Sequence, residues 1–223
     1  MQYIIPIKRH SGLRVRISQP FGANPTIYSQ FKDEFGNSLM GHNGVDLALG
    51  AFDFQKMYGT NLYSCCDGNV AGIVFDNPMS TKGNGVYINS NIYVGSDGKQ
   101  RFIQIVYWHL MEVDVGIQTV KFGEKIGDMG NSGWVLPLPT PSNPYNGTHL
   151  HLGFYPYILE NSIWKKEFPA NGYDGAIDPL PFLGVLNPIG WEYNETLEDI
   201  LDKLSPIKWA IQKIQEAINN LKK

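Results

Sequence analysis

Residues 148–155 read Thr-His-Leu-His-Leu-Gly-Phe-Tyr, in which polar or small side chains alternate with large apolar ones. Successive side chains of a β-strand point to opposite faces, so this period of two predicts a strand with one buried face. Leu150 and Leu152 would anchor that strand in the core. His149 and His151 would share the opposite face, where both imidazoles can reach a single centre.

Several other segments also predict short strands, because apolar or alternating runs are bounded there by turn-forming residues. These strands are expected near residues 13–21, 45–49, 61–65, 69–75, 85–94 and 101–110. Asp67-Gly68 and Asp97-Gly98 lie between apolar runs and are typical of hairpin turns. Residues 121–127 are expected to form a turn that leads into another short strand. Together these patterns predict a mainly β fold.

Two longer stretches are predicted to be loops. Residues 23–41 contain Asn-Pro and Gly-Asn-Ser turn signals. Residues 134–147 contain four prolines, which excludes a regular helix or a central strand. Two interpretations of residues 134–147 stay open: a stiff wall of a binding groove, or an inert surface excursion.

Beyond the predicted sheet, Leu and Ile recur at alternating steps of three and four residues, which predicts amphipathic helices. Two helices are expected, over residues 195–204 and 206–221. We therefore divide the chain into a domain of residues 1–190 and a helical tail of residues 191–223. The tail either packs back onto the domain or, through residues 195–221, joins the chain to a second copy or a larger assembly.

The composition is that of a globular protein, with 43% hydrophobic and 17% charged residues in 223. The net charge of −3 gives no basic field, which argues against a nucleic-acid partner. No apolar run approaches the length of a membrane span. Residues 1–12 lack the charge-then-apolar layout of a secretory signal.

The neighbouring Cys65 and Cys66 are expected to pack in the core without forming a disulfide.

Four of the five histidines fall into three short clusters that together indicate one metal site. The clusters are Gly41–Asp46, Tyr107–Leu110 and Thr148–His151. A catalytic zinc site takes three protein ligands and keeps a fourth position for water. His and Asp supply such ligands, and the spare histidines would be available for acid–base chemistry beside the metal.

The order and surroundings of these clusters give a more specific signal. The chain resembles the lysostaphin/LytM-type zinc endopeptidases of the M23 peptidase family, which cut peptide bonds in bacterial peptidoglycan. The matching segments are Ser18–Gly22, Gly41–Ala48, Asp67–Val70, Gly83–Ile88, Tyr107–Leu110, Val120–Gly133, Thr148–Leu152 and Asp178-Pro179. The resemblance implies a twisted antiparallel β-sheet core with long groove-forming loops, the LytM or duplicated-hybrid-motif type of fold.

The resemblance also implies the site, residue by residue. It makes His42, Asp46 and His151 the ligands of one zinc ion per chain. It makes His109 and His149 the unbound catalytic pair beside the metal water. One of the pair would act as general base, and the other would stabilise the oxyanion or assist the leaving amine. The two roles stay unassigned between them.

The expected function is that of a zinc-dependent endopeptidase acting on a cross-bridge or stem peptide of peptidoglycan. Such an enzyme acts at the bacterial cell wall, outside the cell or in the periplasm. Without a visible signal peptide, delivery by a phage or virion is expected, and a trimmed leader is the alternative. The competing function is a non-catalytic wall-binding or structural module of a virion or other assembly on the same fold.

Overall fold

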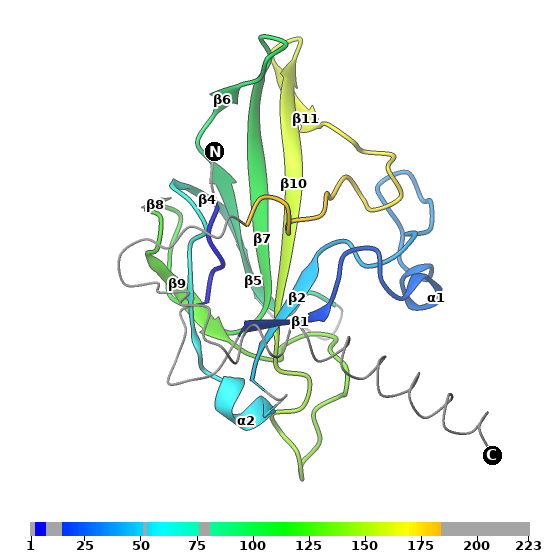
Figure 1. The fold of residues 1–223 in the computed structure, drawn as a ribbon, viewed down its shortest axis with the longest axis vertical. Coiled ribbons are helices and arrows are strands. Elements are labelled where there is room, and N and C mark those ends of the chain that lie inside the picture. The colour runs from blue at the N-terminus through cyan, green and yellow to red at the C-terminus, as the bar shows by residue number, and fades with distance from the viewer. Residues whose placement is uncertain (1–2, 8–14, 51–52, 76–80, 184–223) are drawn as a thin grey trace, which may run out of the picture. The chain divides into compact units, whose positions relative to one another are not determined.

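The computed structural model describes residues 3–7, 15–50, 53–75 and 81–183, which form an antiparallel β-sheet and two single-turn helices (Figure 1). The strands are β1 (Val15–Gln19), β2 (Val45–Leu49), β3 (Asn61–Tyr63), β4 (Gly68–Val74), β5 (Asn84–Ser90), β6 (Tyr93–Val94), β7 (Gln100–Val113), β8 (Thr119–Val120), β9 (Lys125–Met129), β10 (Leu150–Glu160) and β11 (Ile163–Lys166). The helices are α1 (Pro25–Tyr28) and α2 (Phe54–Met57). The predicted mainly β fold is confirmed.

The centre of the sheet is a pair of long antiparallel strands, β7 and β10, which run side by side in Figure 1. The main path of the sheet is β1-β2-β10-β7-β5-β4-β8, with β11, β9, β3 and β6 attached to its members. Strands β2, β10, β7 and β5 are therefore neighbours although they come from distant parts of the sequence. This order brings three of the histidine-containing segments together.

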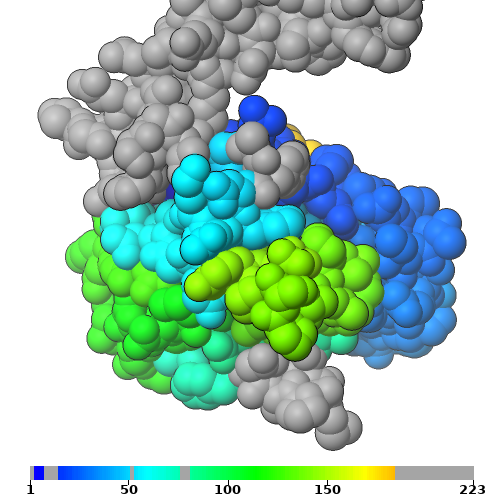
Figure 2. Space-filling model, turned by 90° about the horizontal axis from the view of Figure 1, so that it is seen from below, coloured from blue at the N-terminus to red at the C-terminus, as the bar shows by residue number. Residues whose placement is uncertain are grey.

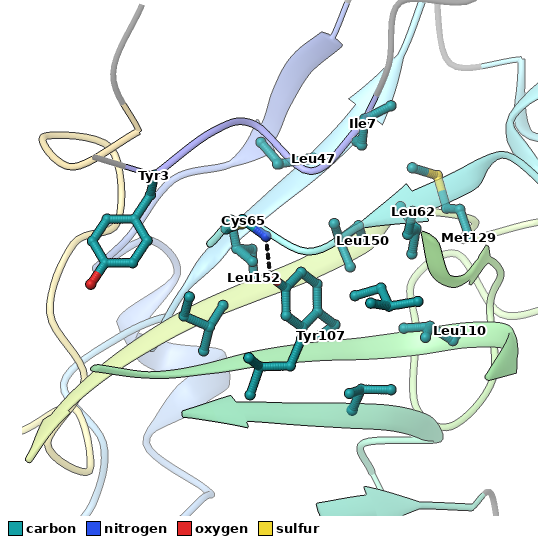
Figure 3. Packing of buried hydrophobic residues seen from close by; sticks show 14 of the residues in the cluster. Tyr3, Ile7, Leu47, Leu62, Cys65, Tyr107, Leu110, Met129, Leu150 and Leu152 are labelled. Carbon is teal, nitrogen blue, oxygen red and sulfur yellow. Dashed lines mark hydrogen bonds between the residues drawn. The ribbon is translucent and has the colours of Figure 1, made fainter. Parts of the chain in front are cut away.

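One face of the central strands forms the hydrophobic core (Figure 3). Leu150 and Leu152 of β10 are fully buried there, as their alternation predicts. Tyr107 of β7 lies among them, and Leu62 and Met129 cover the same face from β3 and β9. Because adjacent residues of a strand point to opposite sides, burying the leucines leaves the histidines of β10 on the other face.

Tyr107 also makes a hydrogen bond inside this core. Its hydroxyl accepts a hydrogen bond of 2.9 Å from the backbone N–H of Cys65, drawn as a dashed line in Figure 3. Both residues are fully buried. Tyr107→Phe would leave the Cys65 N–H without this acceptor, so we expect a loss of about 1–3 kcal/mol in the free energy of unfolding. Urea unfolding measures it, and an unchanged midpoint would contradict this account of the bond.

Most predicted strands are confirmed, and two details are wrong. The strand expected over residues 85–94 is two strands, β5 and β6, and both pair with β7. Asp67-Gly68 is not a hairpin turn, because β3 pairs with β9 and not with β4. The Asp67 carboxylate instead accepts a hydrogen bond from the N–H of Phe122 in the turn before β9. The predicted hairpin at Asp97-Gly98 is confirmed between β6 and β7.

Two loops lie together at one end of the sheet, residues 20–44 and residues 130–149. Figure 2 shows residues 134–147 in lime green, beside the blue first loop and the cyan region of α2. Trp134 contacts Phe31 of the first loop, with ring centroids 5.8 Å apart. Tyr145 contacts Tyr58, with ring centroids 5.2 Å apart. Aromatic contacts therefore hold the proline-rich segment on both sides.

Cys65 and Cys66 are buried free thiols, as predicted.

The helical tail of residues 191–223 and the domain boundary near residue 190 lie outside the described residues, so both stay predictions. Within the described part of the chain, no helix is long and apolar enough to cross a membrane.

Candidate metal centre

The sheet places Asp46 and His151 directly opposite each other on neighbouring strands. Asp46 of β2 is the register partner of His151 of β10, and Trp108 of β7 is the partner of His151 on its other side. Opposite residues on one face have Cβ atoms about 4.5–5.5 Å apart, within reach of a shared ligand. The turn before β2 brings His42 to the same place, and β2 begins at Val45 as predicted.

Three ligand atoms converge at this point. The Nε2 atom of His42 lies 2.8 Å from Nδ1 of His151 and 3.2 Å from Oδ1 of Asp46. The His151 Nδ1 atom lies 3.1 Å from the same carboxylate oxygen. All three residues are buried. Among the described residues, the predicted trio is one of two groups of side chains whose ligand atoms lie close enough together to hold a metal ion.

The chemistry of the three atoms fits a cation. The His42 Nδ1 atom lies 3.2 Å from the carbonyl oxygen of Pro20, to which it donates its proton. The Nε2 atom then presents a lone pair, as does the Asp46 carboxylate. One ring proton at most, that of His151 Nδ1, is shared by three electronegative atoms. Ligand atoms of a tetrahedral zinc lie about 3.3 Å apart, close to the spacing observed here.

The backbone turns His109 toward the same centre through a β-bulge. Asn84 and the next residue, Gly85, pair with Leu110 and Trp108, so His109 is an extra residue in β7. Its φ of 66° lies in the left-handed region, as in bulges that redirect a side chain. Leu110 returns to the core, while Trp108 and His109 both line the cavity.

His109 and His149 form an imidazole pair beside the trio. Their ring centroids are 4.7 Å apart. The Nδ1 atom of His109 donates to the carbonyl of Ser132 at 2.8 Å, and that of His149 donates to the carbonyl of Gly147 at 2.7 Å. Each Nε2 atom is therefore left as a proton acceptor. The His149 Nε2 atom lies 3.6 Å from Asp46 Oδ1, outside the tight trio.

The site opens into a cavity of about 690 Å³. Trp134, Val135, Leu136 and Pro137 line it, which supports the interpretation of residues 134–147 as a groove wall. Tyr28 also lines it, and its ring centroid lies 5.1 Å from that of His42. The predicted site residues Asp46, His109, His149 and His151 also line the cavity, and His42 lies buried behind them.

Burial and neighbouring charges shift the pKa values in the site. Burial lowers the pKa of His151 to about 4, although the Asp46 carboxylate opposes this. Burial and the neighbouring imidazoles hold the pKa of His109 well below its ordinary value. Burial alone would raise the pKa of Asp46, but His149, His151 and His42 outweigh it and keep this pKa well below the usual range.

These shifts predict that the metal-free chain loses stability in mild acid. A histidine with a depressed folded pKa binds its proton more readily in the unfolded chain, so stability is complete above the unfolded value near 6.5. Between pH 6.5 and about 4, His151 should cost roughly 2–3 kcal/mol in the free energy of unfolding. The depressed pKa of Asp46 stabilises the folded chain at every pH above its unfolded pKa of about 3.9, so this contribution is not lost between pH 6.5 and 4.5. Urea unfolding at pH 7 and 4.5 checks this, and His151→Ala should show a smaller pH dependence.

Gly44 provides the space that the His151 ring occupies. A Cβ atom at Gly44 would lie 2.7 Å from Cε1 and 2.8 Å from Nε2 of His151, and 2.6 Å from the carbonyl oxygen of Leu152. Gly44→Ala should therefore displace the ligand and weaken zinc binding about tenfold or more. Gly116→Ala is the matched control, because an added Cβ there meets no atom within 4 Å. Chelator competition measures the zinc affinity, and equal affinities for the two variants would contradict this role.

The second group of possible metal ligands consists of three carboxylates and differs from the buried trio in its charge. Glu112, Asp114 and Asp128 lie close enough together to hold a cation. The ammonium group of Lys125 already lies 3.0 Å from Asp128 Oδ1 and 2.6 Å from Asp114 Oδ2. A lysine therefore already offsets part of the negative charge of this cluster, in contrast to the buried trio.

Sequence reasoning found the five polar residues but missed the groups that orient them. The carbonyl groups of Pro20, Ser132 and Gly147 fix three imidazoles, and backbone acceptors leave no signal in residue type. Trp108 was also missed, because an aromatic residue in a strand is ordinarily a core residue. Its signal would have been its place directly before His109.

The fold and the site together define a protein with a three-ligand metal centre and an adjoining imidazole pair on an antiparallel sheet. The model of Peptidase family M23 matches residues 41–162, more than half of the chain, and this range includes all five site residues. The chain belongs to the M23 peptidase family. Members of this family are generally zinc metallopeptidases, and some are inactive.

This chain is similar to a number of solved structures, among them the following three. A zinc-containing peptidase from Vibrio cholerae is 22% identical, with a TM-score of 0.45, over 84% of this chain and 41% of its own. The catalytic domain of lysostaphin from Staphylococcus simulans is 22% identical, with a TM-score of 0.42, over 75% and 91%. LytU is 25% identical, with a TM-score of 0.45, over 78% and 89%. The chain thus spans less than half of the first of these proteins. No curated protein matches it significantly.

Proposed function

We propose that the chain is a zinc-dependent endopeptidase that hydrolyses peptide bonds in bacterial peptidoglycan. The observation that supports this most is the buried convergence of His42 Nε2, Asp46 Oδ1 and His151 Nδ1 within 3.2 Å of one another. These three atoms would hold the ion. When bound in such a site, zinc acidifies a water molecule and polarises the scissile carbonyl.

The imidazole pair would move the protons. His109 and His149 each donate Nδ1–H to a backbone carbonyl, so each Nε2 atom is oriented to accept a proton. The depressed pKa of His109 keeps this ring neutral at neutral pH, so it begins the reaction as an acceptor. One member of the pair takes the proton of the attacking water, and the proton then passes to the amine that leaves.

The side chains of the cavity suit a peptide that carries carboxylates. Among the described lining residues, three lysines face two aspartates: Lys32, Lys82 and Lys166 against Asp46 and Asp174. Asp174 is paired with Lys166 at 2.6 Å, and Asp46 belongs to the metal trio. The positive charge of Lys32, whose ammonium group donates to the neutral hydroxyl of Ser38, favours a stem peptide with free carboxylates over an uncharged glycine cross-bridge.

Digestion of purified peptidoglycan tests the function. The zinc-loaded chain is incubated with a glycine-bridged wall and with a directly cross-linked wall, and His151→Ala serves as the inactive control. We expect release of free amines, with fragments identified by mass spectrometry and faster cleavage of the directly cross-linked wall. Bound zinc without cleavage of either wall would refute the proposal and favour a non-catalytic wall-binding module.

Action at the cell wall follows from this substrate. Delivery by a phage or virion, and docking through residues 195–221, rest on the sequence alone and stay predictions. Light scattering of the whole chain and of a chain ending before Glu195 tests the docking role. A monomer in both cases would count against a tail that joins copies of the chain.

A further inference from the structure

His151 differs from the other histidines of the site in its surroundings. A histidine that binds a metal usually donates its second ring N–H to a carboxylate or a carbonyl, which fixes the ring. His42 has such a partner in the carbonyl group of Pro20, and His109 and His149 have equivalent ones. The Nε2 atom of His151 is buried and has no hydrogen-bond partner among the described residues.

Packing restrains the His151 ring instead. Trp108 is its register partner on β7, and the two rings stack with centroids 4.6 Å apart and an angle of 9° between their planes. Gly44 approaches the same ring so closely that an added Cβ would lie 2.7 Å from Cε1. The imidazole therefore lies against the indole and beside Gly44, where a larger residue would clash with the imidazole.

The sheet also provides the space for Trp108. Its register partner on the other side is Gly85 of β5, where an added Cβ would lie 2.8 Å from Cδ1 of the indole. The ammonium group of Lys82 lies 5.0 Å from the centroid of the Trp108 ring, within the range of a cation–π contact. One row of register partners across four strands thus contains Asp46, His151, Trp108 and Gly85: two proposed ligands, the stacked ring, and the glycine that leaves room for that ring.

We propose that Trp108 is a positioning residue for the metal ligand His151, and that its stacked ring replaces the hydrogen-bonded partner that the other imidazoles have. This inference rests on the proposed function, because it takes His151 to be a zinc ligand. Trp108 acts through His151 and takes no part in proton transfer.

Zinc affinity measured by competition with a chromophoric chelator tests the proposal. Trp108→Leu and Trp108→Met remove the ring and should weaken zinc binding about tenfold or more. Trp108→Phe retains a stacking ring and should stay within about threefold of the wild-type affinity. Trp164→Leu is the matched control and should keep the wild-type affinity. Trp164 packs on Phe102 of β7, and the register partner of Phe102 on β10 is Tyr157 and not a proposed ligand.

The outcomes separate the two proposals. If the unmodified chain binds no zinc, the proposed function fails before Trp108 is considered. If the chain binds zinc and Trp108→Leu and Trp108→Met bind it equally well, the positioning role is wrong. The role is also wrong if Trp108→Phe is as weak as Trp108→Leu. Thermal unfolding of each metal-free variant identifies any that lose the fold, and the other ring-free variant then decides.

Discussion

His151→Ala should lose zinc binding and peptide hydrolysis together. The substitution removes one of three protein ligands and leaves Asp46 Oδ1 without its partner at 3.1 Å. Zinc sites in proteins contribute about 10–16 kcal/mol of binding free energy, so one ligand accounts for about 3–5 kcal/mol. That share corresponds to a weakening of zinc affinity by about 10²–10⁴-fold. Chelator competition and amine release from peptidoglycan measure the two losses in parallel.

The two readouts must change together for the ligand assignment to hold. Zinc affinity equal to that of the unmodified chain in His151→Ala would remove this residue from the ligand set. The test also needs a folded variant, which urea unfolding of the metal-free chain at pH 7 establishes. Added zinc in excess should restore part of the activity only if the fold is intact.

His149→Ala should separate the two properties, with zinc retained and hydrolysis lost. The Nε2 atom of His149 lies 3.6 Å from Asp46 Oδ1 and outside the trio of ligand atoms, so the ion keeps its three protein ligands. Removing a positioned acid–base group costs about 10²–10⁴-fold in rate. We expect kcat to fall by that factor while the zinc affinity changes little.

His109→Ala, in β7, provides the parallel case. Its ring lies 4.7 Å from that of His149, and its Nδ1 atom is fixed by Ser132. The pH dependence of kcat for the two variants distinguishes their roles, because each variant keeps only one of the two imidazoles. A full hydrolysis rate in His149→Ala would show that this residue takes no part in proton transfer.

Much of the fold was predictable because one face of the central strand is strictly apolar. The alternation at Leu150 and Leu152 determines which side of β10 faces the core, and the structure buries both. The turn before Val45 and the strand after it were also predictable, since two glycines disfavour a helix there. The pairing of β3 with β9 was not predictable, because local turn signals say nothing about partners that are distant in sequence.

The candidate site was predictable in its residue types but not in its geometry. The bulge that turns His109 toward the cavity leaves no mark in a run of apolar and aromatic residues. The stack of Trp108 on His151 requires the register of β7 against β10, which only the folded sheet supplies. Backbone carbonyl groups that orient imidazoles are likewise determined by tertiary structure and not by residue type.

Anomalous diffraction at the zinc absorption edge, from crystals grown with zinc, tests the central claim most directly. The account predicts one peak per chain, bonded to His42 Nε2, Asp46 Oδ1 and His151 Nδ1 at about 2.0–2.2 Å. The absence of a peak between these atoms would contradict it, as would a peak found only at Glu112, Asp114 and Asp128.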